Sequence, residues 1–228
     1  MSWESTVVYY RAINEGVKER LGALHSAKIC LYSVDFAEIE KHQQSGDWEA
    51  AAAILAEGAS RVEQSGADFL VICTNTMHKI APQIEEQIDI PILHIADATA
   101  EKIKDLGMSR VGLLGTRFTM EQDFYRGRLT DRHGLNVVTP AKEDRDFIHR
   151  VIYEELCLGR ILRDSKDGYL RIIDRLLGAG AEAVILGCTE IGLLVNQEDT
   201  SITLLDTTSI HADRAVEMAL SDGSGEYI

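Results

Sequence analysis

The chain of 228 residues is 45% apolar and 26% charged, so it can bury the core of one domain or of two small ones. Its formal net charge of −14 argues against nucleic acid or an anionic membrane as a partner, because phosphate groups attract a basic surface. No apolar run approaches the length that spans a bilayer, and the start, Met1-Ser2-Trp3-Glu4, is neither basic nor hydrophobic, so we expect a cytoplasmic protein.

The first half of the chain predicts helices that alternate with strands. Ser2 or Ser5 can cap a first helix, and Pro82 can begin a later one. The polar segment with Gln43 and Gly46 is typical of a loop. The other expected elements are a strand at 27–34, a helix at 47–64, the strand of the segment 66–76, a strand at 90–95 and a helix opening at 97–104.

The second half repeats this order. Its expected elements are a strand at 110–115, a helix at about 119–133, a strand at 135–138, helices across 143–157 and 166–178, a strand at 183–187, an apolar segment at 202–205 and a helix at about 207–220. We expect the last helix to pack on the first half and residues 221–228 to form a frayed tail.

One stretch occurs twice. The segment Gly66-Ala67-Asp68-Phe69-Leu70-Val71-Ile72-Cys73-Thr74-Asn75-Thr76 returns in altered form as Gly180-Ala181-Glu182-Ala183-Val184-Ile185-Leu186-Gly187-Cys188-Thr189-Glu190. The two copies start at residues 66 and 180, an offset of 114, and this alignment sets Thr74 opposite Cys188. Each copy is a turn, an apolar run of strand length, and then a thiol and hydroxyls where the strand ends.

The repeat extends toward the amino terminus. Tyr10-Arg11 matches Tyr125-Arg126 at an offset of 115, which sets Met1 opposite Thr116. The counterpart of the strand at 110–115 would then lie upstream of residue 1. We therefore expect the first half to lack its first strand.

The fold class that follows is α/β, with two similar doubly wound parallel-sheet lobes related by a pseudo-twofold axis. Apolar strands that alternate with helices indicate parallel sheets covered on both faces. We expect a first lobe at 1–97, completed by a C-terminal helix within 206–228, and a second lobe at 98–205. Ligands of such sheets bind at the carboxyl ends of the strands, so the two repeated turns could face each other across a cleft.

Two proton-transfer groups on opposite faces of one carbon are what inversion of a stereocentre requires. A thiol suits this role, because its pKa near 8.5 lies close to neutrality and a helix amino terminus favours the thiolate. The four cysteines, Cys30, Cys73, Cys157 and Cys188, show no metal-ligand spacing and lie in or beside apolar runs. We expect Cys30 and Cys157 to be core residues and expect no metal site. We expect His78 either to contact the residues that touch the substrate or to lie on a helix surface.

Two motifs resemble one known family. Cys73-Thr74-Asn75-Thr76-Met77-His78 and Gly187-Cys188-Thr189-Glu190-Ile191-Gly192 are similar to the two signatures of the aspartate/glutamate racemase family. Further similar stretches are 1–6, 33–36 and 114–120, and the similarity is greatest to the bacterial branch with aspartate/glutamate-specific racemases. The resemblance implies catalysis by two opposed cysteines without pyridoxal phosphate or another cofactor, an amino-acid substrate and a homodimer.

The chain departs from the family pattern in three ways. The family's first cysteine directly precedes Asn-Thr, whereas Thr74 stands there and Cys73 lies one residue back. The family's first strand, which ends in Gly-Gly, would precede Met1. The lysine that some aspartate racemases use for a substrate carboxylate has no counterpart near 153–157. We expect slow turnover, with the preferred amino acid left open.

The expected catalytic residues are Cys188 on one face of the substrate and Thr74, or Cys73, on the other. The substrate-binding residues are expected to be Asn75, Thr76 and Thr189, which would hold the α-carboxylate, together with Gln43, which the resemblance places near the substrate. Two other functions stay open. One is a cysteine-based decarboxylase or cis–trans isomerase of small dicarboxylates, and the other is a non-catalytic two-lobed amino-acid binder.

Overall fold

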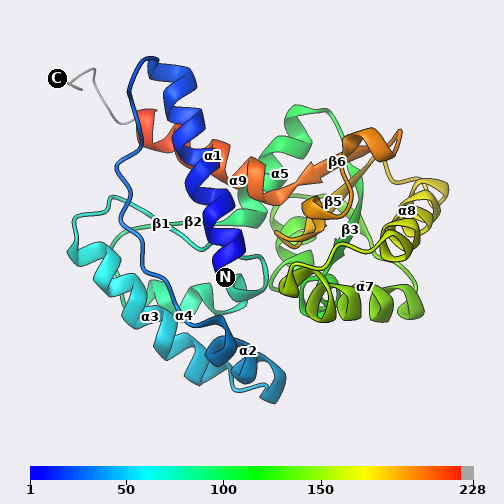
Figure 1. Cartoon of the computed structure of the whole chain (residues 1–228), viewed down its shortest axis with the longest axis horizontal. Helices are drawn as coiled ribbons and strands as arrows, with labels where there is room; N and C mark the ends of the chain where they lie inside the picture. The colour runs from blue at the N-terminus through cyan, green and yellow to red at the C-terminus, as the bar shows by residue number, and fades with distance from the viewer. Residues whose placement is uncertain (222–228) are drawn as a thin grey trace. The chain divides into compact units, whose positions relative to one another are not determined.

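The structure is a computed structural model, and it describes residues 1–221. The chain divides into two compact units (Figure 1). Unit 1 comprises Met1–Cys73, Lys79–His94 and the described part of His211–Ile228, and unit 2 comprises Thr74–His78 and Ile95–Ile210. The tail expected at 221–228 lies outside the described residues except for Ser221, which ends the last helix.

Unit 2 is built on a four-stranded parallel sheet in the order β4-β3-β5-β6. The strands are β3 (Arg110–Gly115), β4 (Asn136–Val138), β5 (Ala183–Gly187) and β6 (Thr203–Asp206). The helices of this unit are α5 (Ile95–Asp105), α6 (Arg117–Glu121), α7 (Lys142–Glu154) and α8 (Arg163–Gly178). Every residue of β5 is buried, as a strand covered on both faces requires. Apolar residues of α5, α7 and α8 share one core with these strands, and Figure 1 shows the strands among those helices.

Unit 1 has a smaller sheet. Strand β1 (Leu70–Val71) pairs in parallel with β2 (Ile92–Leu93), and no further strand joins them among the described residues. The helices are α1 (Trp3–Leu21), α2 (Phe36–Ser45), α3 (Trp48–Gln64) and α4 (Ala81–Glu85), and α9 (Thr207–Ser221) enters this unit at His211. The Tyr9 hydroxyl of α1 donates to Nδ1 of His211 on this last helix at 2.8 Å.

The α/β class with parallel sheets is confirmed, but four local predictions are wrong. Residues 27–34 form no strand, because no strand within residues 1–221 lies beside them to share hydrogen bonds, and Figure 1 draws this segment as a plain trace between α1 and α2. Cys30 on that segment is exposed and is not a core residue. Gln43 lies in helix α2, buried, and not in a surface loop. The helix expected at 119–133 is split into α6 and a π-helical turn at Arg128–Arg132.

The internal repeat is visible in the helix caps. The Ser2 hydroxyl accepts from the Ser5 amide at 3.3 Å at the start of α1, and the Thr116 hydroxyl accepts from the Thr119 amide at 3.3 Å at the start of α6. Ser2 and Thr116 are 114 residues apart, the offset of the repeated strands. The same capping geometry therefore begins the corresponding helix in each unit.

Candidate functional site

The site begins where β5 ends. Cys188 directly follows Gly187, the last residue of β5, and its thiol is buried and donates to Glu190 Oε2 at 3.0 Å. The Thr189 hydroxyl donates to the same oxygen at 2.7 Å. Burial raises the pKa of the Cys188 thiol well above its usual value, and the Glu190 carboxylate raises it further. The resting group is thus a protonated thiol hydrogen-bonded to a carboxylate that can accept its proton.

The strand end is tightly packed. A β-carbon at Gly115, the last residue of β3, would lie 2.8 Å from the Gly187 carbonyl oxygen, and one at Gly187 would lie 2.8 Å from the Leu114 carbonyl oxygen. Such contacts are too short for any side chain. The two glycines therefore let β3 and β5 stay in register up to the residue before the thiol.

The segment Thr74–His78 crosses the same edge of the sheet. Asn75 Nδ2 donates at 3.0 Å to the hydroxyl of Thr207, the residue that directly follows β6. The Thr76 hydroxyl lies 3.0 Å from the hydroxyl of Thr116, the residue that directly follows β3. Strand β5 lies between β3 and β6 in the sheet. The segment thus bridges the strand ends on both sides of Cys188.

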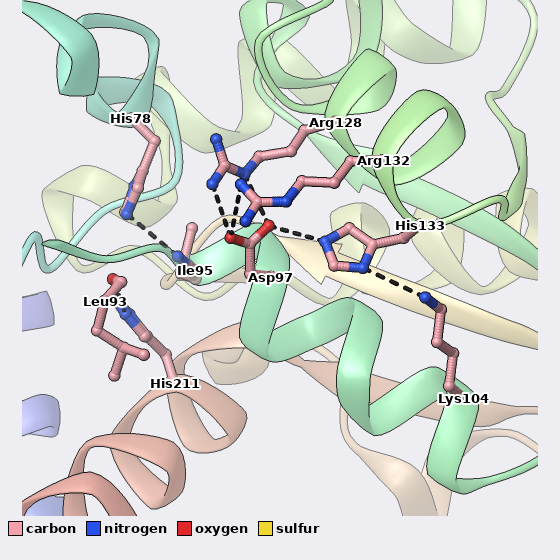
Figure 2. Close-up of polar contacts among 9 residues, drawn as sticks. All are labelled: His78, Leu93, Ile95, Asp97, Lys104, Arg128, Arg132, His133 and His211. Carbon is pink, nitrogen blue, oxygen red and sulfur yellow. Dashed lines mark hydrogen bonds and ion pairs between the residues drawn. The ribbon is translucent and has the colours of Figure 1, made fainter. Parts of the chain in front are cut away.

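His78 fixes the backbone of this segment. Its Nδ1 lies 2.7 Å from the Thr74 carbonyl oxygen, and the amide of Ile95 donates to its Nε2 at 3.2 Å, the contact drawn in Figure 2. Because a carbonyl only accepts and an amide only donates, Nδ1 carries the proton of a neutral imidazole. His78 is buried, so the expected helix-surface position is wrong, and both ring nitrogens serve to hold Thr74 in place.

Two polar atoms at this edge have no hydrogen-bond partner in the described part of the chain. They are Asn75 Oδ1 and Thr208 Oγ1, and both residues are buried. A buried polar atom without a partner costs about 1–3 kcal/mol, and native proteins keep few of them. Asn75 Oδ1 is an acceptor, so it fits a ligand that brings an N–H or O–H group.

The remaining predicted residues belong to unit 1. Cys73 follows the strand β1 and is half-buried, and its carbonyl oxygen accepts from the Met1 ammonium at 2.6 Å. Burial raises the pKa of the Cys73 thiol to about 11, while the Met1 ammonium lowers it. Gln43 lies on α2 in the same unit. Of the predicted site residues, Thr74, Asn75, Thr76, Cys188 and Thr189 belong together in unit 2.

Sequence reasoning did not single out the residues that bind the segment Thr74–His78 or line its edge. These are Thr116, Thr119, Thr207 and Thr208. A usable signal was present, since Thr116 directly follows the apolar run of β3 and Thr207 comes one residue after the apolar pair that ends at Leu205. In a parallel sheet the ends of neighbouring strands meet at one edge, so such hydroxyls gather there.

A charged cluster holds the start of α5. Asp97 accepts from Arg128 Nε and Nη2 at 2.7 Å each and forms a 2.8 Å contact with His133 Nε2, as Figure 2 shows. Lys104 Nζ lies 3.4 Å from His133 Nδ1. The cluster ties α5 to the π-helical turn. Among residues 1–221, no three His, Cys, Asp or Glu side chains gather as a metal site, and no helix is both long and apolar enough to cross a membrane.

Comparison with known proteins places this geometry in context. The family described as Asp/Glu/Hydantoin racemase matches residues 1–215. A crystal structure from Yersinia pestis, assigned to the Asp/Glu racemases, is 57% identical over 96% of both chains, with a TM-score of 0.90. An aspartate racemase homologue from Pyrococcus horikoshii OT3 is 34% identical over 95% of this chain and 94% of its own, with a TM-score of 0.81.

A curated relative adds an activity to the comparison. The broad specificity amino-acid racemase of Bacillus subtilis is 21% identical over 174 residues, which cover 73% of this chain and 71% of that protein. The family match covers most of the chain and includes both repeated strand ends. The chain belongs to the Asp/Glu/Hydantoin racemase family.

Proposed function

We propose that the protein is a cofactor-independent amino-acid racemase that interconverts the L and D forms of aspartate or glutamate at the α-carbon. Family membership supports amino-acid racemisation as the reaction class. The observation that carries the proposal is the buried thiol of Cys188, which donates a hydrogen bond to Glu190. It lies at a strand end that the segment Thr74–His78 crosses. A protonated thiol beside a carboxylate is a proton-transfer group in a place where water is scarce.

In the proposed reaction, Glu190 accepts the thiol proton and leaves Cys188 as a thiolate. The thiolate then removes the α-proton: the C–H bond breaks, an S–H bond forms, and the electron pair spreads into the substrate carboxylate. The raised pKa of Cys188 makes its thiolate a strong base once formed, which suits removal of a weakly acidic proton. Burial also strengthens each hydrogen bond that holds the negative charge.

The substrate's polar groups are matched to hydroxyls and amides of the same edge. We assign the α-carboxylate to the Thr76 and Thr189 hydroxyls and to nearby backbone amides. Asn75 Oδ1 has no hydrogen-bond partner in the described chain, so it suits the α-ammonium group as an acceptor. Asn75 Nδ2 donates one hydrogen to Thr207 and can donate its second hydrogen to the α-carboxylate. Gln43 stays a candidate for the substrate's side chain because it is a buried polar residue.

The second proton-transfer group is proposed to be Thr74, with Cys73 as the alternative. Thr74 belongs to the same unit as Cys188, and its carbonyl is fixed by His78. Its hydroxyl would give a proton to the opposite face and recover one from water, and Glu190 would return the thiol proton to water, which restores the starting state. Because a hydroxyl is a far weaker acid than a thiol, this step should limit the rate. A Cys73→Ser variant as impaired as Cys188→Ser would reassign the role to Cys73.

A non-catalytic amino-acid binder is the second candidate function, and the hydroxyl of Thr74 in place of a thiol favours it. A binder would hold the substrate through Asn75, Thr76 and Thr189 but would leave the α-proton in place. A homodimer, which rests on the family resemblance, is also part of the proposal, and light scattering of the purified protein tests it separately.

The test is proton NMR of L-aspartate, L-glutamate and neutral amino acids incubated with the protein in D2O without pyridoxal phosphate. Racemisation predicts loss of the α-proton signal for at least one amino acid and formation of its enantiomer on a chiral column. Cys188→Ala should abolish the loss, and Cys30→Ala, which removes an exposed thiol of unit 1, should not. Binding of an amino acid without exchange of its α-proton would instead identify a binder. Release of CO2 from the substrate would identify a decarboxylase.

A further inference from the structure

Helix α6 begins directly after β3, and its start is held by side chains that lie outside the helix. It spans only Arg117–Glu121, and so short a helix cannot satisfy the amides of its own first turn. The Arg117 amide donates to His149 Nδ1 on α7 at 3.2 Å, and the Thr119 amide donates to the Thr116 hydroxyl at 3.3 Å. The position of this helix start therefore depends on His149 as well as on the residue that caps it.

Thr116 contacts Thr76 through a chain of buried hydroxyls. The Thr119 hydroxyl lies 3.2 Å from the Thr116 hydroxyl, which is its one hydrogen-bond partner within residues 1–221. Thr119 therefore donates to Thr116, because its buried hydrogen would otherwise have no acceptor. Thr116 Oγ1 also accepts from the Thr119 amide, so its own hydrogen goes to Thr76, 3.0 Å away. The hydrogen of Thr76 is then left for a ligand.

His149 can hold the start of α6 only as a neutral imidazole. An amide nitrogen donates, so Nδ1 carries a lone pair and the ring proton lies on Nε2. The ring also lies edge-on to Phe118 of α6, with 6.1 Å between centroids, and 4.8 Å from the ring of Tyr153 on α7. These contacts fix its orientation. A second ring proton would turn Nδ1 into a donor and break the bond to the Arg117 amide.

The surroundings of His149 favour the neutral ring. Burial lowers the pKa of His149 from its ordinary 6.5, and the Arg117 guanidinium lowers this pKa further. Asp146 on α7 and Glu121 on α6 act in the opposite direction. Glu121 is itself paired with Arg145 at 2.7 Å. The imidazole is therefore neutral at pH 7 and gains its second proton in acid.

We propose that His149 is a positioning residue for substrate binding. Its neutral imidazole fixes the start of α6, which keeps Thr116 in contact with Thr76 and so orients the Thr76 hydroxyl toward the substrate carboxylate. The role given to Thr76 rests on the proposed function. Because His149 acts through α6 and not on the reacting atoms, its loss or protonation should weaken substrate binding and leave the proton transfers of bound substrate nearly unchanged.

The test compares His149→Phe and His149→Asn with the wild-type protein. Phenylalanine keeps the ring contacts but has no acceptor, whereas asparagine Oδ1 can accept from the Arg117 amide and does not titrate. Initial rates of α-proton exchange give KM and kcat. At pH 7.5, His149→Phe should raise KM about 10-fold and change kcat less than about 2-fold. His149→Asn should keep KM near the wild-type value. A wild-type KM in His149→Phe would overturn the proposal.

The pH dependence of KM is the second readout. The wild-type KM should rise as pH falls from 6.5 to 5, because the His149 ring then takes up its second proton. KM of His149→Asn should lack this rise. Groups that both proteins contain, such as Cys188 and Glu190, contribute equally to both profiles. His25→Asn, at an exposed position, is the matched control and should keep the wild-type profile. Identical profiles for wild type and His149→Asn would overturn the proposal.

A third readout does not require activity. Hydrogen exchange of the Arg117 amide, followed by NMR at pH 7, should be at least about 10-fold faster in His149→Phe and nearly unchanged in His149→Asn. An unchanged rate in His149→Phe would overturn the role of this contact. If the wild-type protein exchanges no α-proton, the proposed function alone fails. The Kd of aspartate and glutamate from titration calorimetry then replaces KM in the same comparison, and an absence of binding would overturn the positioning role as well.

Discussion

The thiol of Cys188 and the carboxylate of Glu190 form one buried hydrogen bond, with 3.0 Å between Sγ and Oε2. The two residues are two positions apart in the sequence, at the turn that follows β5. Burial, reinforced by the Glu190 carboxylate, keeps the thiol protonated, and this hydrogen bond gives the proton a route by which it can leave.

Glu190→Gln should lower the rate of α-proton exchange by roughly 100-fold, because glutamine keeps the shape but cannot take the thiol proton. The same change should lower the pKa of Cys188, since the Glu190 charge raises it. Absorbance of the thiolate at 240 nm across a pH titration reports that pKa, and Glu143→Gln, on the exposed start of α7, is the control. A pKa that rises in Glu190→Gln would contradict this account of the bond.

Thr74→Cys should raise the exchange rate at least about 10-fold if Thr74 is the second proton-transfer group, because a thiol is a far stronger acid than a hydroxyl. Cys73→Ser is the matched control and should change the rate little. Initial rates of α-deuterium incorporation compare the two variants. A loss of activity in Cys73→Ser with no gain in Thr74→Cys would move the role to Cys73.

Asp97→Ala should destabilise the protein by about 2–3 kcal/mol, because it leaves Arg128 and His133 partly buried without their carboxylate. Asp123→Ala is the matched control: Asp123 is 91% exposed, lies 3.9 Å from Arg126 and should contribute little. Urea unfolding of both variants measures the difference. Equal midpoints for the two would show that the Asp97 cluster is not a stabilising one.

His211 should make the protein sensitive to acid. Burial lowers its pKa from 6.5 to about 4, so the folded state holds fewer protons than the unfolded state between these values. The stability it contributes is present above pH 6.5 and is lost as pH falls toward 4, by roughly 3 kcal/mol in all. His211→Gln should flatten that slope in urea unfolding between pH 7.5 and 4.5, and His25→Gln, at an exposed position, should leave it unchanged.

Gly115→Ala should reduce both the stability of the fold and the rate of substrate α-proton exchange. A β-carbon there would lie 2.8 Å from the Gly187 carbonyl oxygen and would push the end of β5 away. Gly178→Ala on α8 is the control, because a β-carbon there meets no atom within 4 Å. It should stabilise the protein by up to about 1 kcal/mol. Thermal unfolding and exchange rates of the two variants decide the point, and an active, stable Gly115→Ala would refute the packing argument.

The sequence predicts best those elements whose apolar pattern is complete by itself. Strands β3 and β5 lie where the runs at 110–115 and 183–187 indicate them, because β3 is apolar after Arg110, β5 is apolar throughout, and each has a partner in the sheet. The run at 27–34 is largely apolar but forms no strand, since a ladder needs a neighbour and local propensity cannot supply one. Gln43 shows the opposite error: polar composition predicts a loop, yet the segment is a capped helix.

The sequence nominates members of the candidate site, but it does not reveal the contacts among them. The repeat marks Thr74 and Cys188, because strand ends of a parallel sheet carry ligand-binding residues. The bond from Asn75 to Thr207 joins residues 132 positions apart, and no spacing rule reveals such a pair. Glu190 follows the thiol in sequence, but an acid at that point also fits a helix start, and the direction of its side chain depends on the fold.

The most direct test of the central claim follows α-deuterium incorporation into L-aspartate and D-aspartate, and into both glutamate enantiomers, in separate reactions. If Cys188 and Thr74 act on opposite faces of the α-carbon, each removes the α-proton of a different enantiomer. In a single turnover, Cys188→Ala should then lose α-proton removal from one enantiomer, and Thr74→Ala should lose it from the other. Unchanged exchange of both enantiomers in Cys188→Ala would contradict the assignment of that thiol as a proton-transfer group.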